Sequence, residues 1–175
     1  MADPPWLYDL WSEAGEGKAP QAQYDCMPDE EIAALPIERL AATNSACFMW
    51  ATFPKLPSAL AIMQAWGFDY RTGGAWAKQS STGKKWAFGT GYIFRSASEL
   101  LLVGVRGEPK WLSKSVRNLW IAPLREHSRK PDCVPADIER LALTPRLELF
   151  ARAPRDGWTV WGNEVDKFAA DFDVI

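Results

Sequence analysis

The sequence predicts an α/β fold with a mostly parallel central sheet and helices on both faces. Short runs rich in Val, Ile, Leu and aromatic residues alternate along the chain with stretches of helical pattern. One run, residues 100–105, is apolar throughout, as expected for a central strand buried on both faces. With 47% apolar and 24% charged residues, the 175-residue chain can bury one core of ordinary size. We therefore predict a single domain over residues 1–175.

The first half of the chain is predicted to hold two helices and two strands. The first helix starts with three acidic residues at its positive end and stops before Pro36. The second has Pro57 in its first turn and Gly67 as its terminator. Apolar and aromatic runs follow each helix at strand length. The elements expected here are the helix 29–35, the strand 47–51, the helix 57–66 and the strand 70–78.

The second half is predicted to hold four more strands and one helix. The helix places Ile138, Leu141 and Ala142 on one side, as an amphipathic helix does. The strands are short apolar runs bounded by Gly, Pro or charged residues. The elements expected here are the strands 100–105 and 118–122, the helix 135–143, and the strands 147–150 and 158–161.

Charge is distributed unevenly, although the net charge is only −2. Residues 1–70 hold 3 Lys/Arg against 10 Asp/Glu, whereas residues 71–130 hold 12 against 3. Residues 131–175 return to an acidic balance, with 5 against 9. A basic segment on an otherwise acidic chain favours a polyanion-binding face. A solvated basic loop is the alternative.

Two stretches, residues 79–95 and 106–117, show no regular pattern and are long for connections in a compact domain. Both mix basic residues with aromatics, a combination that suits phosphate neutralisation and base stacking. The alternative is that their aromatics fold back on the core. We predict that both stretches are substrate loops and bind the nucleic-acid backbone. The basic residues expected to do so are Lys84, Lys85, Arg95, Lys110 and Lys114.

Several classes of protein are disfavoured by composition. The three cysteines are isolated, and with the single His127 they offer no zinc spacing, so no metal is expected. His127 lies among loop-forming residues, and no histidine-based triad is available. Nothing resembles a signal peptide, and no apolar run is long enough to span a bilayer. We expect a cytoplasmic protein with reduced thiols and no membrane partner.

Residues 3–6, Asp-Pro-Pro-Trp, have the chemistry that methylation of an amino group on a base requires. The adenine N6 amine is a poor nucleophile, and acceptors at its hydrogens stabilise the charge that develops on nitrogen. Asp3 is an acceptor when ionised, and Pro4 and Pro5 offer carbonyls without competing N–H donors. Trp6 offers a face on which an extruded base can stack. Taken alone, the four residues equally fit a turn followed by a packed tryptophan.

The order of motifs resembles the adenine-N6 methyltransferase family that includes the eukaryotic mRNA adenosine methyltransferases and their bacterial and phage relatives. The resemblance covers nearly the whole chain and is closest in pattern to the prokaryotic and phage members. Its motifs are residues 3–6 (Asp-Pro-Pro-Trp), Tyr24 with the acidic helix start 27–31, residues 48–50 with 66–68, residues 76–78, 89–92 and 99–107, residues 127–131, residues 147–152, and residues 161–164 (Trp-Gly-Asn-Glu).

This resemblance implies a Rossmann-like fold that uses S-adenosylmethionine, with the catalytic motif early and part of the cofactor site late. Asp3, Pro4, Pro5 and Trp6 would line the catalytic pocket. Asn163 and Glu164 would hydrogen-bond the cofactor ribose, and Arg152 and Lys130 would support the cofactor or the catalytic loop. A solvated lysine at a helix start is the alternative for Lys130. The residues expected to contact the substrate are Tyr24, Trp76, Lys78, Lys84, Lys85, Tyr92 and Arg95.

Two positions depart from the family pattern. Many prokaryotic relatives have a histidine before the glutamate of the middle strand, whereas Ser98 precedes Glu99 here. The late arginine-rich loop has Ala153 and Pro154 where the eukaryotic enzymes have a histidine. Neither position carries the central chemistry, so transfer from the sulfonium directly to the amine is still expected.

The function expected is therefore methylation of the adenine N6 amine in DNA, by a prokaryotic or phage-encoded enzyme. RNA is the nearest alternative substrate. A non-catalytic nucleic-acid-binding subunit is a second class, disfavoured by the intact Asp3 and Trp6. A small-molecule methyltransferase is a third, disfavoured by the basic segment. For the oligomeric state, the sequence allows both a homodimer and a heterodimer with a related subunit.

The two ends of the chain suggest a circular permutation. In relatives, a buried strand of an aromatic, an acid and two aliphatics precedes the catalytic motif. Residues 172–175, Phe-Asp-Val-Ile, would supply that strand if Ile175 were joined to Met1. We expect residues 172–175 to complete the strand that leads into residues 1–6, which would bring Asp173 near the cofactor. An ordinary apolar tail is the alternative.

Overall fold

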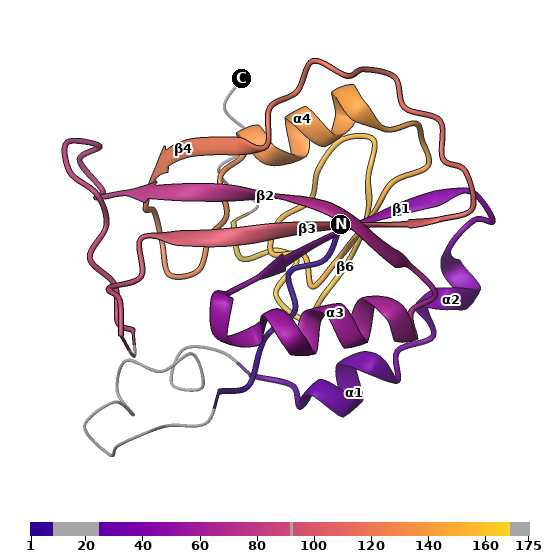
Figure 1. Cartoon of the computed structure of the whole chain (residues 1–175), viewed down its shortest axis with the longest axis horizontal. Helices are drawn as coiled ribbons and strands as arrows, with labels where there is room; N and C mark the ends of the chain where they lie inside the picture. The colour runs from indigo at the N-terminus through magenta and orange to yellow at the C-terminus, as the bar shows by residue number, and fades with distance from the viewer. Residues whose placement is uncertain (9–24, 92, 169–175) are drawn as a thin grey trace.

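The computed structural model describes residues 1–8, 25–91 and 93–168, and shows a mixed α/β architecture built on a four-stranded sheet (Figure 1). The strands lie in the order β1 (Ser45–Ala51), β3 (Ser98–Arg106), β2 (Asp69–Gln79) and β4 (Leu119–Pro123). β3 runs antiparallel to both β1 and β2, whereas β2 and β4 are parallel. The expectation of a mostly parallel sheet is therefore wrong for these four strands. The described residues between β2 and β3 form no crossover helix, and the chain returns antiparallel.

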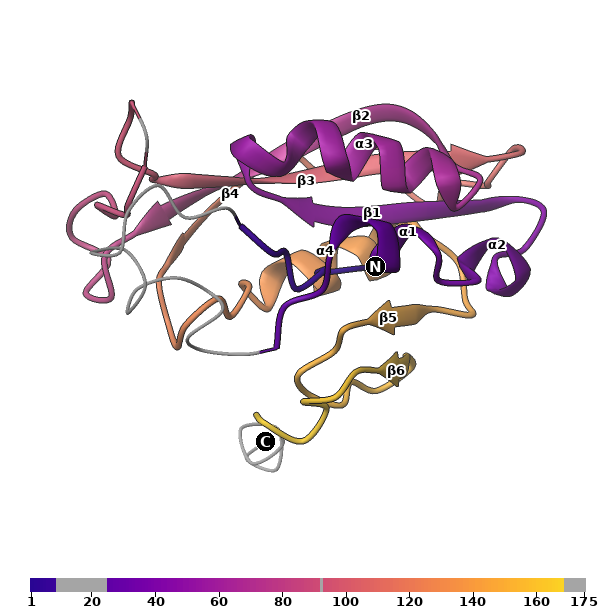
Figure 2. The same ribbon diagram turned by 90° about the horizontal axis from the view of Figure 1, so that it is seen from below.

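The N-terminal residues join this sheet to a second, two-stranded one. β5 (Leu147–Leu149) and β6 (Thr159–Trp161) pair in parallel. Ala2 forms parallel bridges with Met49 of β1 and with Leu149 of β5. Its backbone N–H donates to the Phe48 carbonyl at 2.8 Å, and the Leu149 N–H donates to the Met1 carbonyl at 2.9 Å. Residues 1–3 thus lie between β1 and β5, where Figure 2 marks the N-terminus.

Helices cover both faces, as the sequence predicts. α1 (Asp29–Ala33), α2 (Ile37–Leu40) and α3 (Leu56–Ala65) pack over one face, and α4 (Cys133–Leu141) packs over the other. Because side chains alternate along a strand, β1 serves both cores. Its Met49 packs with Ile62 and Met63 of α3, while its neighbour Trp50 packs with the core that contains Ile138 of α4.

The positions of the expected elements are confirmed to within a few residues, from α1 to β6. Two short elements were not predicted, α2 and the 3₁₀ turn η3 (Phe53–Lys55), because four or three residues carry no readable periodicity. The described parts of residues 80–97 and 107–118 contain no helix or strand beyond isolated bridges at Trp86 and Trp111. They match the two irregular stretches that the sequence indicates.

Some expectations fall on parts of the chain that the structure does not describe. Tyr24, Tyr92, Asp173 and the segment 172–175 lie outside the described residues. The circular permutation therefore stays a prediction. Within the described residues, no helix is both long enough and apolar enough to cross a bilayer.

The contact between α1 and α3 gives a test of the fold. The Trp66 indole is 1% exposed, and its Nε1 donates to the Ile32 carbonyl at 3.0 Å. Trp66→Phe should lower the free energy of unfolding by about 1–3 kcal/mol, because it removes a buried hydrogen bond to the Ile32 carbonyl and leaves a small void. Urea denaturation measures this. Trp86→Phe is the matched control, since Trp86 is 60% exposed, and should change the stability by less than about 0.5 kcal/mol. Equal effects would contradict the packing described.

Candidate active site

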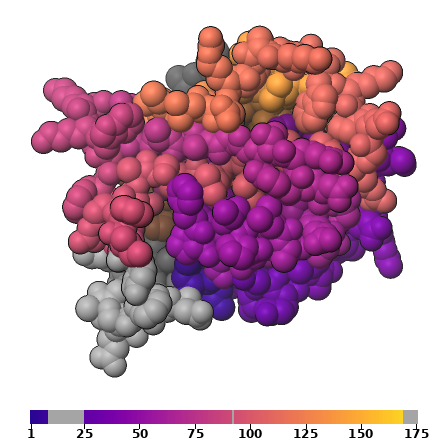
Figure 3. Space-filling model, viewed as in Figure 1, coloured from indigo at the N-terminus to yellow at the C-terminus, as the bar shows by residue number. Residues whose placement is uncertain are grey.

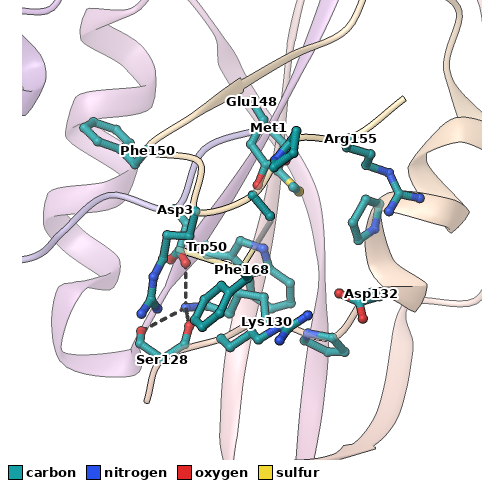
Figure 4. A pocket seen from close by; sticks show the side chains of 16 residues that line it. Met1, Asp3, Trp50, Ser128, Lys130, Asp132, Glu148, Phe150, Arg155 and Phe168 are labelled. Carbon is teal, nitrogen blue, oxygen red and sulfur yellow. Dashed lines mark hydrogen bonds and ion pairs between the residues drawn. The ribbon is translucent and has the colours of Figure 1, made fainter. Parts of the chain in front are cut away.

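Asp3 stands at the rim of a pocket formed where residues 1–3 leave the sheet. Its backbone N–H donates to the Leu149 carbonyl at 3.4 Å, which fixes the point where the chain turns into the two prolines. The pocket is a cavity of about 80 Å³ beside the ends of β1 and β5. Figure 4 shows Asp3, Lys130 and Phe168 gathered around it, and Phe150 and Arg152 also line it. The cavity combines a carboxylate with cations and aromatic rings.

Lys130 links Asp3 to a buried row of alternating charges. Its Nζ lies 2.9 Å from Asp3 Oδ2 and 3.3 Å from Glu99 Oε2. Glu99 Oε1 in turn lies 2.5 Å from Lys78 Nζ. The side chains of Lys130, Glu99 and Lys78 are only 12–14% exposed, and that of Asp3 is 21% exposed. The row therefore runs from the pocket rim into the sheet with each charge beside one of opposite sign.

Two tryptophans hold the two lysines in place. Lys130 Nζ lies 5.7 Å from the centroid of the Trp50 ring, and Lys78 Nζ lies 5.0 Å from that of Trp76. The two rings meet edge to face, with centroids 6.4 Å apart. Both indoles are almost fully buried. An ammonium near an aromatic face is attracted to it, so the two tryptophan rings help to fix the positions of the lysine side chains.

Burial and neighbouring charges shift the two carboxyls in opposite directions. Burial raises the pKa of Asp3. The positive charge of Lys130 counteracts this rise, and the negative charge of Glu99 adds to it. Burial also tends to raise the pKa of Glu99, but Lys130 and Lys78 outweigh this effect and lower the pKa. The Lys130 ammonium is therefore the main group that favours the ionised form of Asp3, while two lysines favour the ionised form of Glu99.

The residues assigned to the cofactor surround the same pocket, although not all line it. Arg152 lines it, and its Nε lies 3.1 Å from Glu164 Oε2. Asn163, which follows β6, is exposed. The Phe168 ring lies between two guanidinium groups, 4.5 Å from that of Arg129 and 4.8 Å from that of Arg152. Thus Lys130 and Arg152 line the pocket, Glu164 is joined to it through Arg152, and Asn163, next to Glu164 in sequence, lies outside the lining.

The remaining residues of the catalytic motif are tied to the protein. The Pro4 carbonyl accepts the Trp6 N–H at 2.9 Å, and the Pro5 carbonyl accepts the Met27 N–H at 2.8 Å. Trp6 is 4% exposed and packs in the core under α1 and α3, with its Nε1 donating to the Trp50 carbonyl at 3.3 Å. In this arrangement the Trp6 ring fixes the motif to β1 and has no open face for a base.

The residues assigned to the substrate fall into two groups. Trp76 and Lys78 point into the protein, where Trp76 Nε1 donates to the Ala122 carbonyl at 3.0 Å and Lys78 pairs with Glu99. Lys84, Lys85 and Arg95 are exposed on the segment between β2 and β3. This segment projects from one end of the molecule (Figure 3). The first group is therefore buried behind the pocket and does not line it. Among the described residues assigned to the substrate, the second group is the one exposed to a large ligand.

The projecting segment also carries exposed aromatic rings. Trp86 is 60% exposed, Phe88 is 81% exposed and Phe94 is 84% exposed. The Arg95 guanidinium lies 5.2 Å from the Phe88 ring centroid. The alternative that these aromatics fold back on the core is therefore wrong for this segment. Trp111 of the second stretch is 40% exposed and meets Phe48 edge-on at 6.4 Å, so it packs partly against the sheet.

Sequence reasoning missed several residues that line the pocket or contact its lining. Glu99 was noted only as a family position, although an acid within an apolar strand must find a cationic partner when buried. Trp50 was assigned to a strand but not to the pocket. Glu148 faces the cavity, and burial raises its pKa to about 7. His127 lies in a loop, as predicted, and its carbonyl accepts a hydrogen bond from Arg152 Nη1 at 2.8 Å. Only the three-dimensional arrangement brings these side chains together.

A second cavity, of about 510 Å³, lies between the sheet and α4 beneath residues 107–118. Its walls are mainly apolar and include Phe48, Trp111, Trp120 and Ile138. The charged residues at its border, Arg71, Glu108 and Arg117, are not joined to the Asp3–Lys130 row by any ion pair described. The larger cavity is therefore not the one bordered by the Asp3–Lys130 row of charges.

The MT-A70 family matches residues 1–164, so the chain belongs to this family. It is 31% identical over 170 residues to an N(6)-adenosine-methyltransferase MT-A70-like protein of Arabidopsis thaliana, covering 95% of this chain and 23% of that protein. It is 29% identical over 181 residues to the human N(6)-adenosine-methyltransferase catalytic subunit METTL3, covering 100% and 29%. It is also 27% identical over 183 residues to the type II methyltransferase M.MunI of Mycoplasma sp, covering 94% and 76%.

The chain spans about a quarter of the length of the plant relatives that it matches. The match includes the segments that build the pocket, since Asp3, Glu99, Lys130 and Arg152 all lie within residues 1–164. The family assignment and the geometry therefore concern the same part of the molecule.

The ion pair at the pocket rim can be tested by titration. Lys130→Met removes the ammonium that lies 2.9 Å from Asp3, so burial and Glu99 act unopposed and the pKa of Asp3 should rise by about one unit or more. Carboxyl ¹³C chemical shifts measured across pH give this pKa. Lys55→Met is the matched control, because Lys55 pairs with Asp29 at 2.9 Å instead. An unchanged or lower Asp3 pKa in Lys130→Met would contradict the geometry.

Proposed function

We propose that this protein is an S-adenosylmethionine-dependent methyltransferase that acts on the N6 amine of adenine in nucleic acid. The observation that carries the proposal is the position of Asp3, a nearly buried carboxylate at the pocket rim held by Lys130 at 2.9 Å. Membership of the MT-A70 family supports it, as do the adenosine-methyltransferase names of the relatives.

Asp3 has the properties required of the group that accepts a hydrogen bond from the amine. As a carboxylate it accepts without donating, so it can draw a hydrogen of the amine and stabilise the positive charge that develops on nitrogen. Lys130 favours its ionised form and so opposes the burial that raises its pKa. The carbonyls of Pro4 and Pro5 each accept one backbone bond and can accept another, since a carbonyl oxygen has two lone pairs.

The donor set around the pocket fits S-adenosylmethionine in its chemical types. When bound, the cofactor supplies a methyl group on a positively charged sulfur. Lys130 and Arg152 are suited to hold its carboxylate, and Asn163 and Glu164 are suited to hold its ribose hydroxyls. The 80 Å³ cavity is only a few water volumes, and Phe168 lies at its wall, so Phe168 must move to admit a whole cofactor.

The projecting segment between β2 and β3 is proposed to hold the nucleic acid. Lys84, Lys85 and Arg95 can neutralise phosphates, and the exposed rings of Trp86 and Phe88 can stack on bases. Both kinds of side chain are exposed together on one segment, and a solvated basic loop does not need exposed aromatic rings. The same combination disfavours a small-molecule substrate.

DNA is the substrate that the sequence pattern favours, and RNA is the alternative. The relatives do not separate the two, because their names include adenosine methyltransferases and a type II methyltransferase. A Rossmann-like arrangement is part of the proposal, supported by the parallel alignment of residues 1–3 with β1 and β5. Assembly as a homodimer, or with a related subunit, is also part of the proposal.

One experiment tests the activity and the substrate together. The protein is incubated with methyl-labelled S-adenosylmethionine and, separately, with double-stranded DNA, single-stranded DNA or RNA, and the digested nucleosides are separated and identified. Label in N6-methyldeoxyadenosine supports DNA, and label in N6-methyladenosine supports RNA. Label in a methylated cytosine, or in no nucleoside while a small molecule is labelled, would overturn the proposal.

Asp3→Asn should reduce the rate of methyl transfer by about 10²–10³, because the amide lacks the negative charge that stabilises the developing cation. The amide keeps the shape of the side chain, so the fold should persist, and far-UV circular dichroism checks this. Asp69→Asn is the control, since that side chain is 77% exposed. Single-turnover rates that stay within a factor of three of wild type would remove Asp3 from the chemistry.

Lys84→Glu and Lys85→Glu should each weaken nucleic-acid binding at every sequence and flatten its salt dependence by about one unit of slope. Fluorescence anisotropy at several salt concentrations measures both. Arg39→Glu in α2 reverses another exposed charge, away from this segment, and should leave affinity and slope unchanged. Equal effects of all three variants would show that only net charge matters, not the projecting segment.

A further inference from the structure

Lys78 has no direct contact with Asp3 among the described interactions, yet it belongs to the same row of charges. It comes from β2, where it lies two residues beyond Trp76, which stands opposite Glu99 in the β2–β3 register. Lys78 and Trp76 therefore face the same side of the sheet, and Lys78 reaches Glu99 diagonally across the two strands. Each oxygen of Glu99 has its own lysine, Oε1 with Lys78 and Oε2 with Lys130.

This arrangement makes Glu99 a competitor for Lys130. Asp3 and Glu99 both approach the Lys130 ammonium, at 2.9 Å and 3.3 Å. The single positive charge of Lys130 cannot fully offset two carboxylates, and their mutual repulsion is strong where water is excluded. A second cation on the far side of Glu99 relieves the competition. Lys78 is that cation, and its own position is fixed by the ring of Trp76.

We propose that Lys78 is a positioning residue for methyl transfer: by neutralising Glu99, it leaves the Lys130 ammonium to hold Asp3 as an ionised acceptor. This assignment rests on the proposed function of Asp3, and it replaces the direct contact with substrate that the sequence suggests for Lys78. Lys78 acts through Glu99 and Lys130, not by touching the reacting atoms.

The proposal predicts opposite effects for two neighbours. Lys78→Met strengthens the hold of Glu99 on Lys130, so the pKa of Asp3 should rise by about half a unit to one unit. Glu99→Gln removes the competing carboxylate, so the pKa of Asp3 should fall by a similar amount. Because Asp3 works as the anion, the acid limb of the activity profile should move to higher pH in the first variant and to lower pH in the second.

The other charged groups that face Asp3 stay the same in these variants. Lys130 approaches it from the segment before α4, Arg152 acts on it from the segment after β5, and Glu148 acts from β5 itself. Arg129, Asp132 and Arg155 line the same cavity. A shift that appears on changing Lys78 or Glu99 can therefore be assigned to the row that joins them to Asp3.

The experiment is a double-mutant cycle on the full chain, with the pKa of Asp3 measured by carboxyl ¹³C titration of wild type, Lys78→Met, Glu99→Gln and the double variant. If Lys78 acts through Glu99, Lys78→Met should raise the Asp3 pKa in the wild-type background and change it by less than about a third of that amount in the Glu99→Gln background. Lys78→Arg should restore the wild-type value. Lys110→Met, at an exposed lysine, is the control.

Equal shifts in both backgrounds, shifts of the same sign for Lys78→Met and Glu99→Gln, or no shift would each overturn the proposal. If Lys78→Met does not fold, Lys78→Arg and Glu99→Gln still test it: the first should leave the Asp3 pKa unchanged and the second should lower it. The titration needs neither cofactor nor nucleic acid. A protein that methylates no nucleic acid but shows these shifts would refute the proposed function, whereas an active protein without them would refute only the role of Lys78.

Discussion

The contact between Lys130 and Asp3 is the interaction on which the candidate site depends. A carboxylate that is four-fifths buried costs free energy unless a cation accompanies it, and Lys130 provides that cation at 2.9 Å. The lysine is itself held by the face of Trp50 and by Glu99, so its position is set by β1 and β3. The sheet thus places the Lys130 ammonium beside Asp3, at the end of the N-terminal segment.

The contact between Lys130 and Asp3 requires residues 1–3 to lie within the sheet. Backbone hydrogen bonds on both sides join this segment to β1 and β5, and the two prolines that follow turn the chain out of the sheet at Asp3. Trp6 then packs under α1 and α3 and fastens the motif from the other side. The carboxylate therefore stands at a fixed point, as a group that must meet a reacting amine in one geometry should.

The sequence predicted the positions of the strands and helices well, because strongly apolar runs such as β3 and amphipathic helices such as α4 carry clear periods. Strand direction was not predictable in the same way, since an apolar run reads alike in parallel and antiparallel pairing. Trp76 and Lys78 illustrate a different limit. The family resemblance predicts that both contact the substrate, but the side-chain alternation of β2 turns both toward the core.

The pairing of Glu99 with two lysines could not be read from the chain, because Lys78, Glu99 and Lys130 come together only through the strand register and the segment before α4. By contrast, composition indicated the basic and aromatic segment between β2 and β3, although the structure was needed to show that its aromatic rings are exposed. The motif likewise predicts Asp3 as the candidate acceptor, whereas the charged groups that surround Asp3 were not predicted. Local sequence patterns indicate the candidate site residues, and the tertiary fold determines which charged groups lie beside them.

The most direct test of the account is a crystal structure of the protein with S-adenosylhomocysteine, the demethylated form of the proposed methyl donor. The account predicts that the ligand's carboxylate lies within hydrogen-bonding reach of Lys130 or Arg152, that its ribose meets Asn163 or Glu164, and that Phe168 has moved from between the two arginines. A ligand in the apolar cavity between the sheet and α4, with Lys130, Arg152 and Phe168 unchanged, would contradict it.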